Sequence, residues 1–192
     1  MSQFTVVYDA NVFYPAPLRD LLLRLAATRL FRARWTAQIR DEWMRNLLAN
    51  RPDLSAERIT RTADMIDSSS HDCLVEGYEH LIPCIGGLPD QDDRHVLAAA
   101  MKCGAELIVT FNLKDFPASA LAEYGVEAIH PDDFIVDVLD LDAGACIQAV
   151  REMRASLKNP PKTQDEFLAT LLKQQLPQVK SKICCKFLWF VG

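Results

Sequence analysis

The chain has 192 residues, a mass of 21.6 kDa and a formal net charge of −5 at pH 7. Hydrophobic residues make up 49% of it and charged residues 24%, which is the composition of a globular protein with one principal domain. The acidic balance argues against a strongly basic nucleic-acid binder but not against a nuclease, because bound divalent cations reverse the sign of an acidic pocket.

The cysteines and the amino terminus bear on the compartment. The six cysteines include no C-x-x-C pair and no Cys/His spacing of a zinc site, which favours free thiols in a reducing cytosol. The first residues, MSQFTVVYD, lack the charged and apolar regions of a signal peptide, and no run approaches the length of a membrane span. These features predict a cytoplasmic protein without a membrane segment.

The first part of the chain alternates predicted strands and helices. Residues 4–9, FTVVYD, are continuously apolar up to the final acid, which is typical of a strand buried on both faces. From Leu18 the leucines follow helical spacing, and residues 31–35, FRARW, predict a second strand. Thr36 is a candidate N-cap for the next helix. The core stripe of that helix is expected to consist of Ile39, Trp43 and Leu47.

Further elements continue the alternation. The break at residues 50–53 is followed by a polar helix, and residues 73–75, CLV, are a short strand candidate. The buried residues of the polar helix are expected to be Ile59, Met65 and Ile66. A helix over 92–103 and strands over 106–110 and 125–129 follow. This order predicts an α/β fold, a three-layer α/β/α sandwich with a mainly parallel sheet.

The pattern in the remainder of the chain predicts only helices. We therefore divide the whole chain into a domain over 1–135 and a helical extension over 136–192. Within the extension, Thr163 and Glu166 have the spacing of a capping box. The tail over 178–192 ends in an apolar run without a polar face. That run fits a buried terminal strand, a partner-binding element or a segment foreign to the natural protein, and the pattern does not choose among them.

The stretch LPDQDDRHVLAAA, residues 88–100, places Asp90, Asp92 and Asp93 directly before an apolar helix. Three carboxylates exceed what capping a helix requires. The stretch is therefore either a solvated acidic turn or part of a cation site. Asp93 precedes Val96 by three residues and therefore shares the face that is expected to meet the sheet. His95 is expected on the opposite side, at the surface, like the other three histidines: His71, His80 and His130.

Other acidic and polar residues are expected near Asp93. Asp9 ends the first strand and Asn112 follows the 106–110 strand, so both belong at the carboxyl edge of a parallel sheet, where ligands collect. Glu42 lies about 60° around its helix from Ile39, at the rim of the buried stripe. Each residue alone has an ordinary explanation as a cap, a solvated side chain or a turn. Acids that converge from separate segments favour a cation, and oxygen ligands favour Mg²⁺ or Mn²⁺.

Taken together, these residues resemble a known family. Asp9-Ala10-Asn11 after a strand, Glu42 on a helix, DDRHVLAAA and VTFNLKDF (109–116) are similar to motifs of the PIN-domain ribonucleases, specifically the VapC-type toxins of bacterial toxin–antitoxin pairs. The resemblance covers roughly residues 4–135. It implies a PIN-like fold and Mg²⁺- or Mn²⁺-dependent cleavage of RNA by an activated water. It also implies a cognate antitoxin and a homodimer.

The resemblance also implies roles for individual residues. Asp9, Glu42 and Asp93 would be the acidic metal ligands, and Asn11 would orient Asp9. Many relatives carry a fourth acid where this chain has Asn112, so that role falls to Asn112 or to Asp115. Thr110 and Asn112 would support the ligands or contact phosphate. Some basic residues lie near these motifs in the sequence and are candidates to contact phosphates of the substrate: Arg19, Arg40, Arg45, Arg94 and Lys114.

Two alternatives stay open. One is a phosphotransfer protein, although a phosphatase of the haloacid-dehalogenase type needs a second Asp at the position of Asn11, and a receiver domain needs an acidic pair before the first strand. The other is a non-catalytic RNA-binding or interaction module with the same fold.

Overall fold

The computed structural model describes residues 3–69 and 72–187. In this part of the chain four strands form one parallel sheet in the order β2-β1-β3-β4. The register places Val6 opposite Ala33 and Val7 opposite Ile108. The strands are β1 (Thr5–Tyr8), β2 (Arg32–Arg34), β3 (Leu107–Val109) and β4 (Glu127–Ile129). The predicted parallel α/β sheet is confirmed.

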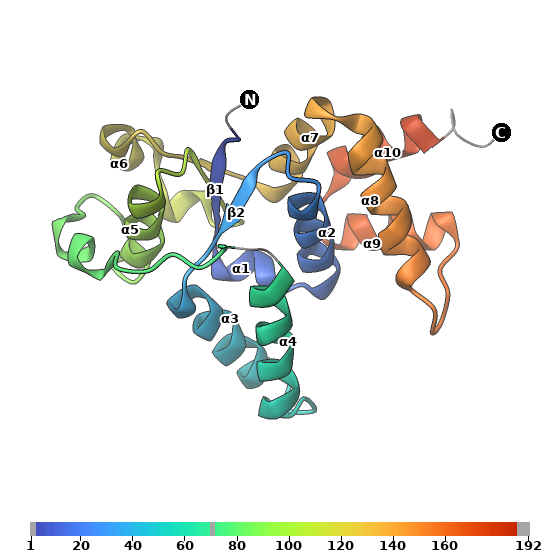
Figure 1. The fold of residues 1–192 in the computed structure, drawn as a ribbon, viewed down its shortest axis with the longest axis horizontal. Helices are drawn as coiled ribbons and strands as arrows, with labels where there is room; N and C mark the ends of the chain where they lie inside the picture. Colours follow the sequence, from blue (N-terminus) through green and yellow to red (C-terminus); the bar gives the residue numbers. More distant parts are fainter. Residues whose placement is uncertain (1–2, 70–71, 188–192) are drawn as a thin grey trace.

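Helices cover both faces of the sheet (Figure 1). Helices α5 and α6 lie on one side of the strands, and α2 and α7 lie on the other, with α8, α9 and α10 outside them. The helices of the domain are α1 (Ala10–Phe13), α2 (Ala16–Ala27), α3 (Ala37–Asn50), α4 (Ala56–Ser69), α5 (Arg94–Cys103), α6 (Ala118–Leu121) and α7 (Pro131–Leu141). Short 3-10 turns, η1 (Glu79–Cys84), η2 (Leu113–Asp115) and η3 (Ala122–Tyr124), complete it.

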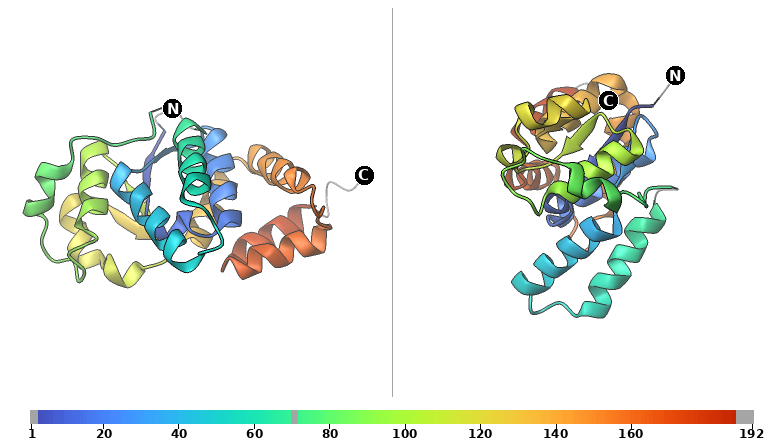
Figure 2. Two further views of the ribbon diagram at one scale, coloured as in Figure 1. Left: turned by 90° about the horizontal axis from the view of Figure 1, so that it is seen from below. Right: turned by 90° about the vertical axis from the view of Figure 1, so that its left-hand side faces the viewer.

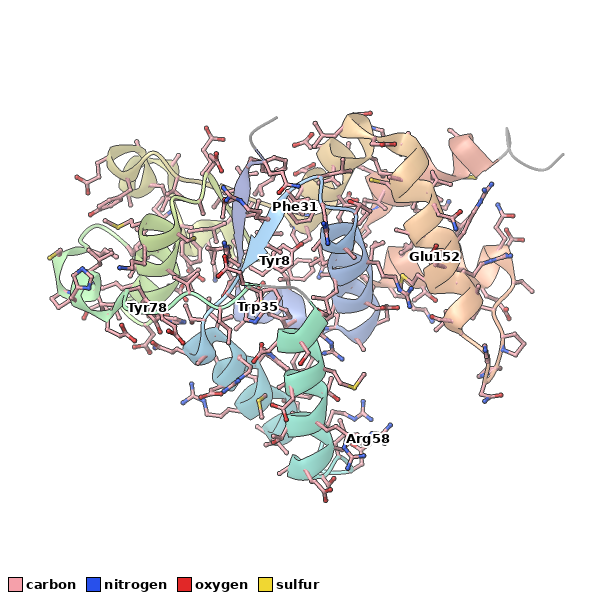
Figure 3. All side chains as sticks on the ribbon, viewed as in Figure 1. Tyr8, Phe31, Trp35, Arg58, Tyr78 and Glu152 are labelled. Atoms are coloured by element: carbon pink, nitrogen blue, oxygen red, sulfur yellow. The ribbon has the colours of Figure 1, made fainter. Side chains whose placement is uncertain are left out.

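Aromatic rings fill the core around the end of β1. The ring of Tyr8 lies parallel to that of Trp35, with centroids 6.4 Å apart, and Phe31 meets Phe134 of α7 edge-on at 5.1 Å. Figure 3 shows Tyr8, Phe31 and Trp35 together at the centre of the molecule. Because these residues are fully buried, the carboxyl end of β1, and with it Asp9, is held in a rigid surrounding.

Helices α3 and α4 form an antiparallel pair that extends from the body of the domain (Figure 2, right). Thr36 caps α3 by accepting a hydrogen bond from the Ile39 N–H at 3.0 Å, as expected. The prediction that Met65 is buried is wrong, since its side chain is 68% exposed. Ala63 is buried instead, because α4 packs one narrow face against its neighbours.

The strand candidate at residues 73–75 forms only an isolated bridge. The Trp35 N–H donates to the Cys73 carbonyl at 3.0 Å, and the Val75 N–H donates to the Trp35 carbonyl at 2.8 Å. These two bonds dock the segment beside the end of β2 without extending the sheet.

The extension consists of α8 (Ala143–Ser156), α9 (Gln164–Lys173) and α10 (Pro177–Phe187). Thr163 and Glu166 form the expected capping box of α9. The division at 135/136 falls inside α7 and stays a proposal. Most of the apolar run that ends the tail lies outside the described residues. In the described part of the chain, no helix has both the length and the apolar character needed to span a membrane.

Candidate active site

Asp9 is fixed at the carboxyl end of β1. It is 4% exposed and occupies the N-cap of α1, where one carboxylate oxygen accepts a 2.6 Å hydrogen bond from the Ala10 N–H. The other oxygen accepts hydrogen bonds from the Thr110 hydroxyl at 2.7 Å and from the Asn11 amide at 2.6 Å. Three donors therefore set the orientation of this buried carboxylate.

Asn11 and Thr110 join the ends of β1 and β3. The Asn11 amide also lies 2.8 Å from the Thr110 hydroxyl oxygen, and the Asn11 carbonyl oxygen accepts from the Phe111 N–H at 3.1 Å. The Thr110 hydroxyl in turn accepts from the Asn112 N–H at 3.0 Å. The structure thus brings together Asp9, Asn11 and Thr110, and it places the backbone of Asn112 beside them.

Asp93 lies within a group of acids. It stands at the N-cap position of α5, but its carboxylate caps no backbone N–H. Burial is the largest cause that raises the pKa of Asp93 to about 7, and the nearby carboxylates of Asp9, Asp90, Asp115 and Glu42 contribute to the same rise. The shift has the causes expected where like charges crowd a partly buried site. Asp93 is therefore close enough to these acids to be repelled by them.

The other two predicted ligands respond to the same surroundings. Burial raises the pKa of Asp9 to about 6, with Glu42 adding to the shift and the Thr110 hydrogen bond opposing it. Burial also raises the pKa of Glu42, and the charge of Arg45 opposes that shift. Asp90 behaves as the predicted turn residue, since its carboxylate accepts from the Asp92 N–H at 2.9 Å.

The donor set fits a hard divalent cation by its chemistry. It is rich in carboxylate oxygens whose mutual repulsion a cation would relieve. Within residues 3–69 and 72–187, however, no three Asp, Glu, His or Cys side chains are already gathered closely enough to hold one ion. The acids lie near one another without sharing a coordination shell, an arrangement suited to Mg²⁺, which commonly keeps several of its waters.

His95 is a residue of this site that the sequence did not reveal. The prediction of a surface position is wrong, since His95 is 4% exposed. Its Nδ1 lies 2.6 Å from the Asp92 carbonyl oxygen, and its Nε2 lies 3.6 Å from Glu42 Oε2. The side of α5 that was expected to face solvent thus lies toward Glu42 of α3, and α5 also packs against η1, which follows Tyr78, a buried residue that Figure 3 labels. The sequence did carry one signal of this burial. Residues 96–100 are all apolar and therefore occupy every side of the helix.

Two of the five candidate cations are engaged elsewhere in the fold, whereas a third lies beside the acids. Arg19 lies 5.2 Å from the centre of the Trp43 ring and donates to the Phe13 carbonyl at 2.6 Å, so it belongs to the packing of α1 and α3. Arg40 pairs with Asp67 at 2.8 Å. Arg45, by contrast, is exposed and close enough to Glu42 to lower the pKa of that acid.

The fold and these residues agree with the comparisons to known proteins. Residues 5–114 match the family model described as the PIN domain, and residues 131–183 match that of the VapC50 C-terminal domain. Since the first match spans more than half of the chain, this protein belongs to the PIN-domain family. A protein of Mycobacterium tuberculosis named "Putative ribonuclease VapC50" is 43% identical over 106 residues, 55% of this chain and 61% of that protein.

The match therefore spans about three fifths of the length of that relative. None of the solved structures gives a significant match. The resemblance to a VapC-type PIN protein with a C-terminal extension, drawn from the motifs, is confirmed.

Proposed function

We propose that this protein is a divalent-metal-dependent ribonuclease and the toxin of a toxin–antitoxin pair. The observation that supports this most strongly is that the charges of Asp9 and Glu42 reach Asp93 and help to raise its pKa to about 7. A carboxylate with so perturbed a pKa in a partly buried acid cluster is typical of a functional site. The name of the mycobacterial relative supports RNA as the substrate.

In this proposal Asp9, Glu42 and Asp93 bind Mg²⁺ or Mn²⁺ directly or through water. The bound cation would supply an activated water and neutralise charge on the scissile phosphate. Asn11 and Thr110 hold Asp9 in one orientation through the hydrogen bonds described above. No side-chain nucleophile is needed.

The fourth acidic role fits Asp115 better than Asn112. The carboxylate of Asp115 lies close enough to Asp93 to raise its pKa, which an uncharged amide does not do. The Asn112 N–H is tied to the Thr110 hydroxyl, so Asn112 supports the edge of the site. Arg45 is the cation that we assign to a phosphate of the RNA, since it lies beside Glu42 without belonging to the core.

The test is cleavage of a labelled RNA by the wild type, Asp93→Asn and Asp90→Asn, with Mg²⁺ or Mn²⁺ and with EDTA. We expect EDTA and Asp93→Asn to abolish cleavage and Asp90→Asn largely to spare it. The products should carry 5′-phosphate and 3′-hydroxyl ends, because water is the nucleophile. Cleavage that ignores EDTA, or a 2′,3′-cyclic phosphate end, would contradict the proposal.

Partners follow from the same proposal. The VapC50 likeness supports a small antitoxin whose carboxyl-terminal segment places an Arg or Lys among the carboxylates, together with a homodimer in the cytoplasm. Size-exclusion chromatography with light scattering tests the dimer, and co-purification with the product of the neighbouring reading frame tests the antitoxin. A monomer at high concentration that binds no such product would contradict this part.

Phosphotransfer has no comparable support. The position that would need a second acid holds Asn11, and the amide of Asn11 is bonded to Asp9 and Thr110. A non-catalytic role would not explain why these acids lie near one another.

A further inference from the structure

A cavity of about 490 Å³ lies where the α3–α4 pair meets the start of α2 and the C-terminal extension. Its volume falls within the range of small-ligand sites. The polar members of its lining are Tyr14, Arg19, Arg51, Arg58, Thr62 and Gln174. None of the described residues that line it is an Asp or a Glu. The wall of this cavity therefore carries positive charge in a protein whose net charge is −5.

The three arginines of the cavity have few acids to balance them. Arg51 donates two hydrogen bonds of 2.7 Å to Asp53 through Nε and one Nη, which leaves the other Nη free to donate. The pKa of Asp53 is lowered by its bond with Arg51 and also by the charge of Arg58, so this one exposed acid serves two arginines. Among the described residues, no acid forms a salt bridge with Arg19 or Arg58. Burial lowers the pKa of Arg19, and the charge of Asp20 opposes that shift.

Neutral groups add the chemistry of a nucleotide site. Tyr14 is partly buried in the wall, and an aromatic face is a platform on which any base can stack. The Thr62 hydroxyl donates to the Arg58 carbonyl at 2.9 Å, and its oxygen can still accept a hydrogen bond from a ligand. Gln174 lines the cavity from the extension, so a ligand here would contact both parts of the chain.

The cavity is distinct from the acid cluster but close to it. Helix α1 has Asp9 as its N-cap and Tyr14 as its C-cap, so about 8 Å of helical rise separates their backbones. Helix α3 supplies Glu42 to the cluster and Leu47 to the cavity, about 140° apart around its axis. Figure 3 labels Arg58 near the start of α4, below the centre of the molecule. An RNA strand at the acid cluster can therefore continue into the cavity.

We propose that this cavity binds one nucleotide of the RNA substrate, outside the cleavage site. Arg51 and Arg58 contact the phosphate, and the Tyr14 ring stacks on the base. A second point of attachment holds the strand in place over the acid cluster. This inference rests on the proposed function for the identity of the ligand, because a ribonuclease has to bind RNA beyond the bond that it cleaves.

The test is the affinity for a labelled single-stranded RNA, measured by fluorescence anisotropy in EDTA, where the proposed function predicts no cleavage. Arg58→Gln should weaken binding several-fold. It should also make the slope of log affinity against log salt concentration shallower by about 0.7, which is the contribution of one phosphate contact in a single strand.

Arg61→Gln is the matched control. Arg61 lies one turn further along α4, pairs with Glu57 at 3.3 Å and is not part of the cavity wall, yet its substitution removes the same charge. Equal effects of Arg58→Gln and Arg61→Gln, or an unchanged slope in Arg58→Gln, would overturn the proposal.

Tyr14 supplies a second criterion. Tyr14→Leu should weaken RNA binding about 10-fold, as is typical when a stacking ring is lost, whereas Tyr14→Phe keeps the ring and should bind nearly as the wild type does. Equal losses in the two variants would overturn the stacking role. Should Tyr14→Leu not fold, Arg58→Gln and Arg61→Gln decide, since both of these side chains are exposed.

Two further probes test the kind of ligand. Adenosine monophosphate offers a single phosphate and base, and hexaglutamate offers negative charge alone. Both should bind the wild type much more weakly than the RNA does. Equal affinity for either probe would overturn the assignment of the cavity to an RNA strand.

The two levels of inference fail in different ways. A wild-type protein that binds RNA without cleaving it in the presence of Mg²⁺ or Mn²⁺ would contradict the proposed function alone. Cleavage by the wild type, together with equal RNA affinities of Arg58→Gln and Arg61→Gln, would contradict only the nucleotide site. A wild-type protein that binds no RNA would contradict both.

Discussion

The Thr110 hydroxyl donates a 2.7 Å hydrogen bond to the Asp9 carboxylate, although 101 residues separate the two. Both residues are buried, and they stand at the ends of neighbouring strands β3 and β1. Parallel pairing of these strands is what brings the donor to the acceptor.

This bond gives the first prediction. Thr110→Val should lower the free energy of unfolding by about 2 kcal/mol, because a buried carboxylate loses a donor. It should also raise the pKa of Asp9 further, since this hydrogen bond opposes the effect of burial. Urea denaturation at pH 7 measures the first effect. Thr110→Ser keeps the hydroxyl and serves as the control, so an equal loss in both variants would contradict the role of the bond.

The second prediction concerns the stability of the metal-free protein against pH. Because folding raises the pKa of Asp93 from 3.8 to about 7, the folded state binds more protons than the unfolded state between these values. The contribution of Asp93 to stability is therefore full below about pH 4 and is lost as the pH rises through 7.

Urea denaturation in EDTA between pH 4.5 and pH 8, values chosen to bracket most of this window, measures the effect. The difference in stability between the wild type and Asp93→Asn isolates Asp93 from the other groups that titrate. As the pH rises, the free energy of unfolding of the wild type should fall relative to that of Asp93→Asn. A difference that is constant across the range would contradict the raised pKa.

Removal of the charge itself gives the third prediction. At pH 8 without metal, Asp93→Asn should be at least as stable as the wild type, since a nearly isosteric amide relieves the repulsion from Asp9, Asp90, Asp115 and Glu42. Thermal melts in EDTA measure this. Asp90→Asn is the comparison, because it weakens the turn bond to the Asp92 N–H and should not stabilise the protein as much. A large loss of stability in Asp93→Asn would mean that its carboxylate has a structural role.

The fourth prediction concerns the attachment of the C-terminal helix. The buried carboxylate of Asp132 in α7 accepts hydrogen bonds from the backbone N–H groups of Gln178 and Val179, both at 2.9 Å. Asp132 thus caps α10 from a distant segment. Asp132→Ala should destabilise α10 by about 2 kcal/mol, because two N–H groups of its first turn lose a charged acceptor.

Hydrogen exchange of the α10 amides measures this loss directly. Asp133→Ala is the matched control, since the Asp133 carboxylate accepts a hydrogen bond from the side chain of Gln178 at the exposed surface. Faster exchange in both variants, or in neither, would contradict the capping role. Limited proteolysis adds a check on the proposed division of the chain, for which a stable fragment ending between residues 155 and 180 is expected.

The sequence alone determined the features that depend on neighbouring residues. The segment FTVVYD shows no alternation of polar and apolar residues before its final acid, which predicts a strand buried on both faces, and β1 is buried throughout. The capping box of α9 joins residues that are three positions apart. Strand direction alone placed Asp9 and Asn112 at one edge of the predicted parallel sheet, and β1 and β3 are indeed parallel neighbours.

Only the tertiary structure decided which helix faces are covered. His95 is buried on the side of α5 that periodicity assigned to solvent, where it faces Glu42 of α3, a helix distant in sequence. Met65 is exposed because α4 is covered along a narrower stripe than its apolar residues suggest. Asp132 caps a helix that begins 45 residues later, at Pro177. Periodicity records which residues prefer burial, but the contacts that bury or bond them come from segments whose positions depend on the packing of the whole chain.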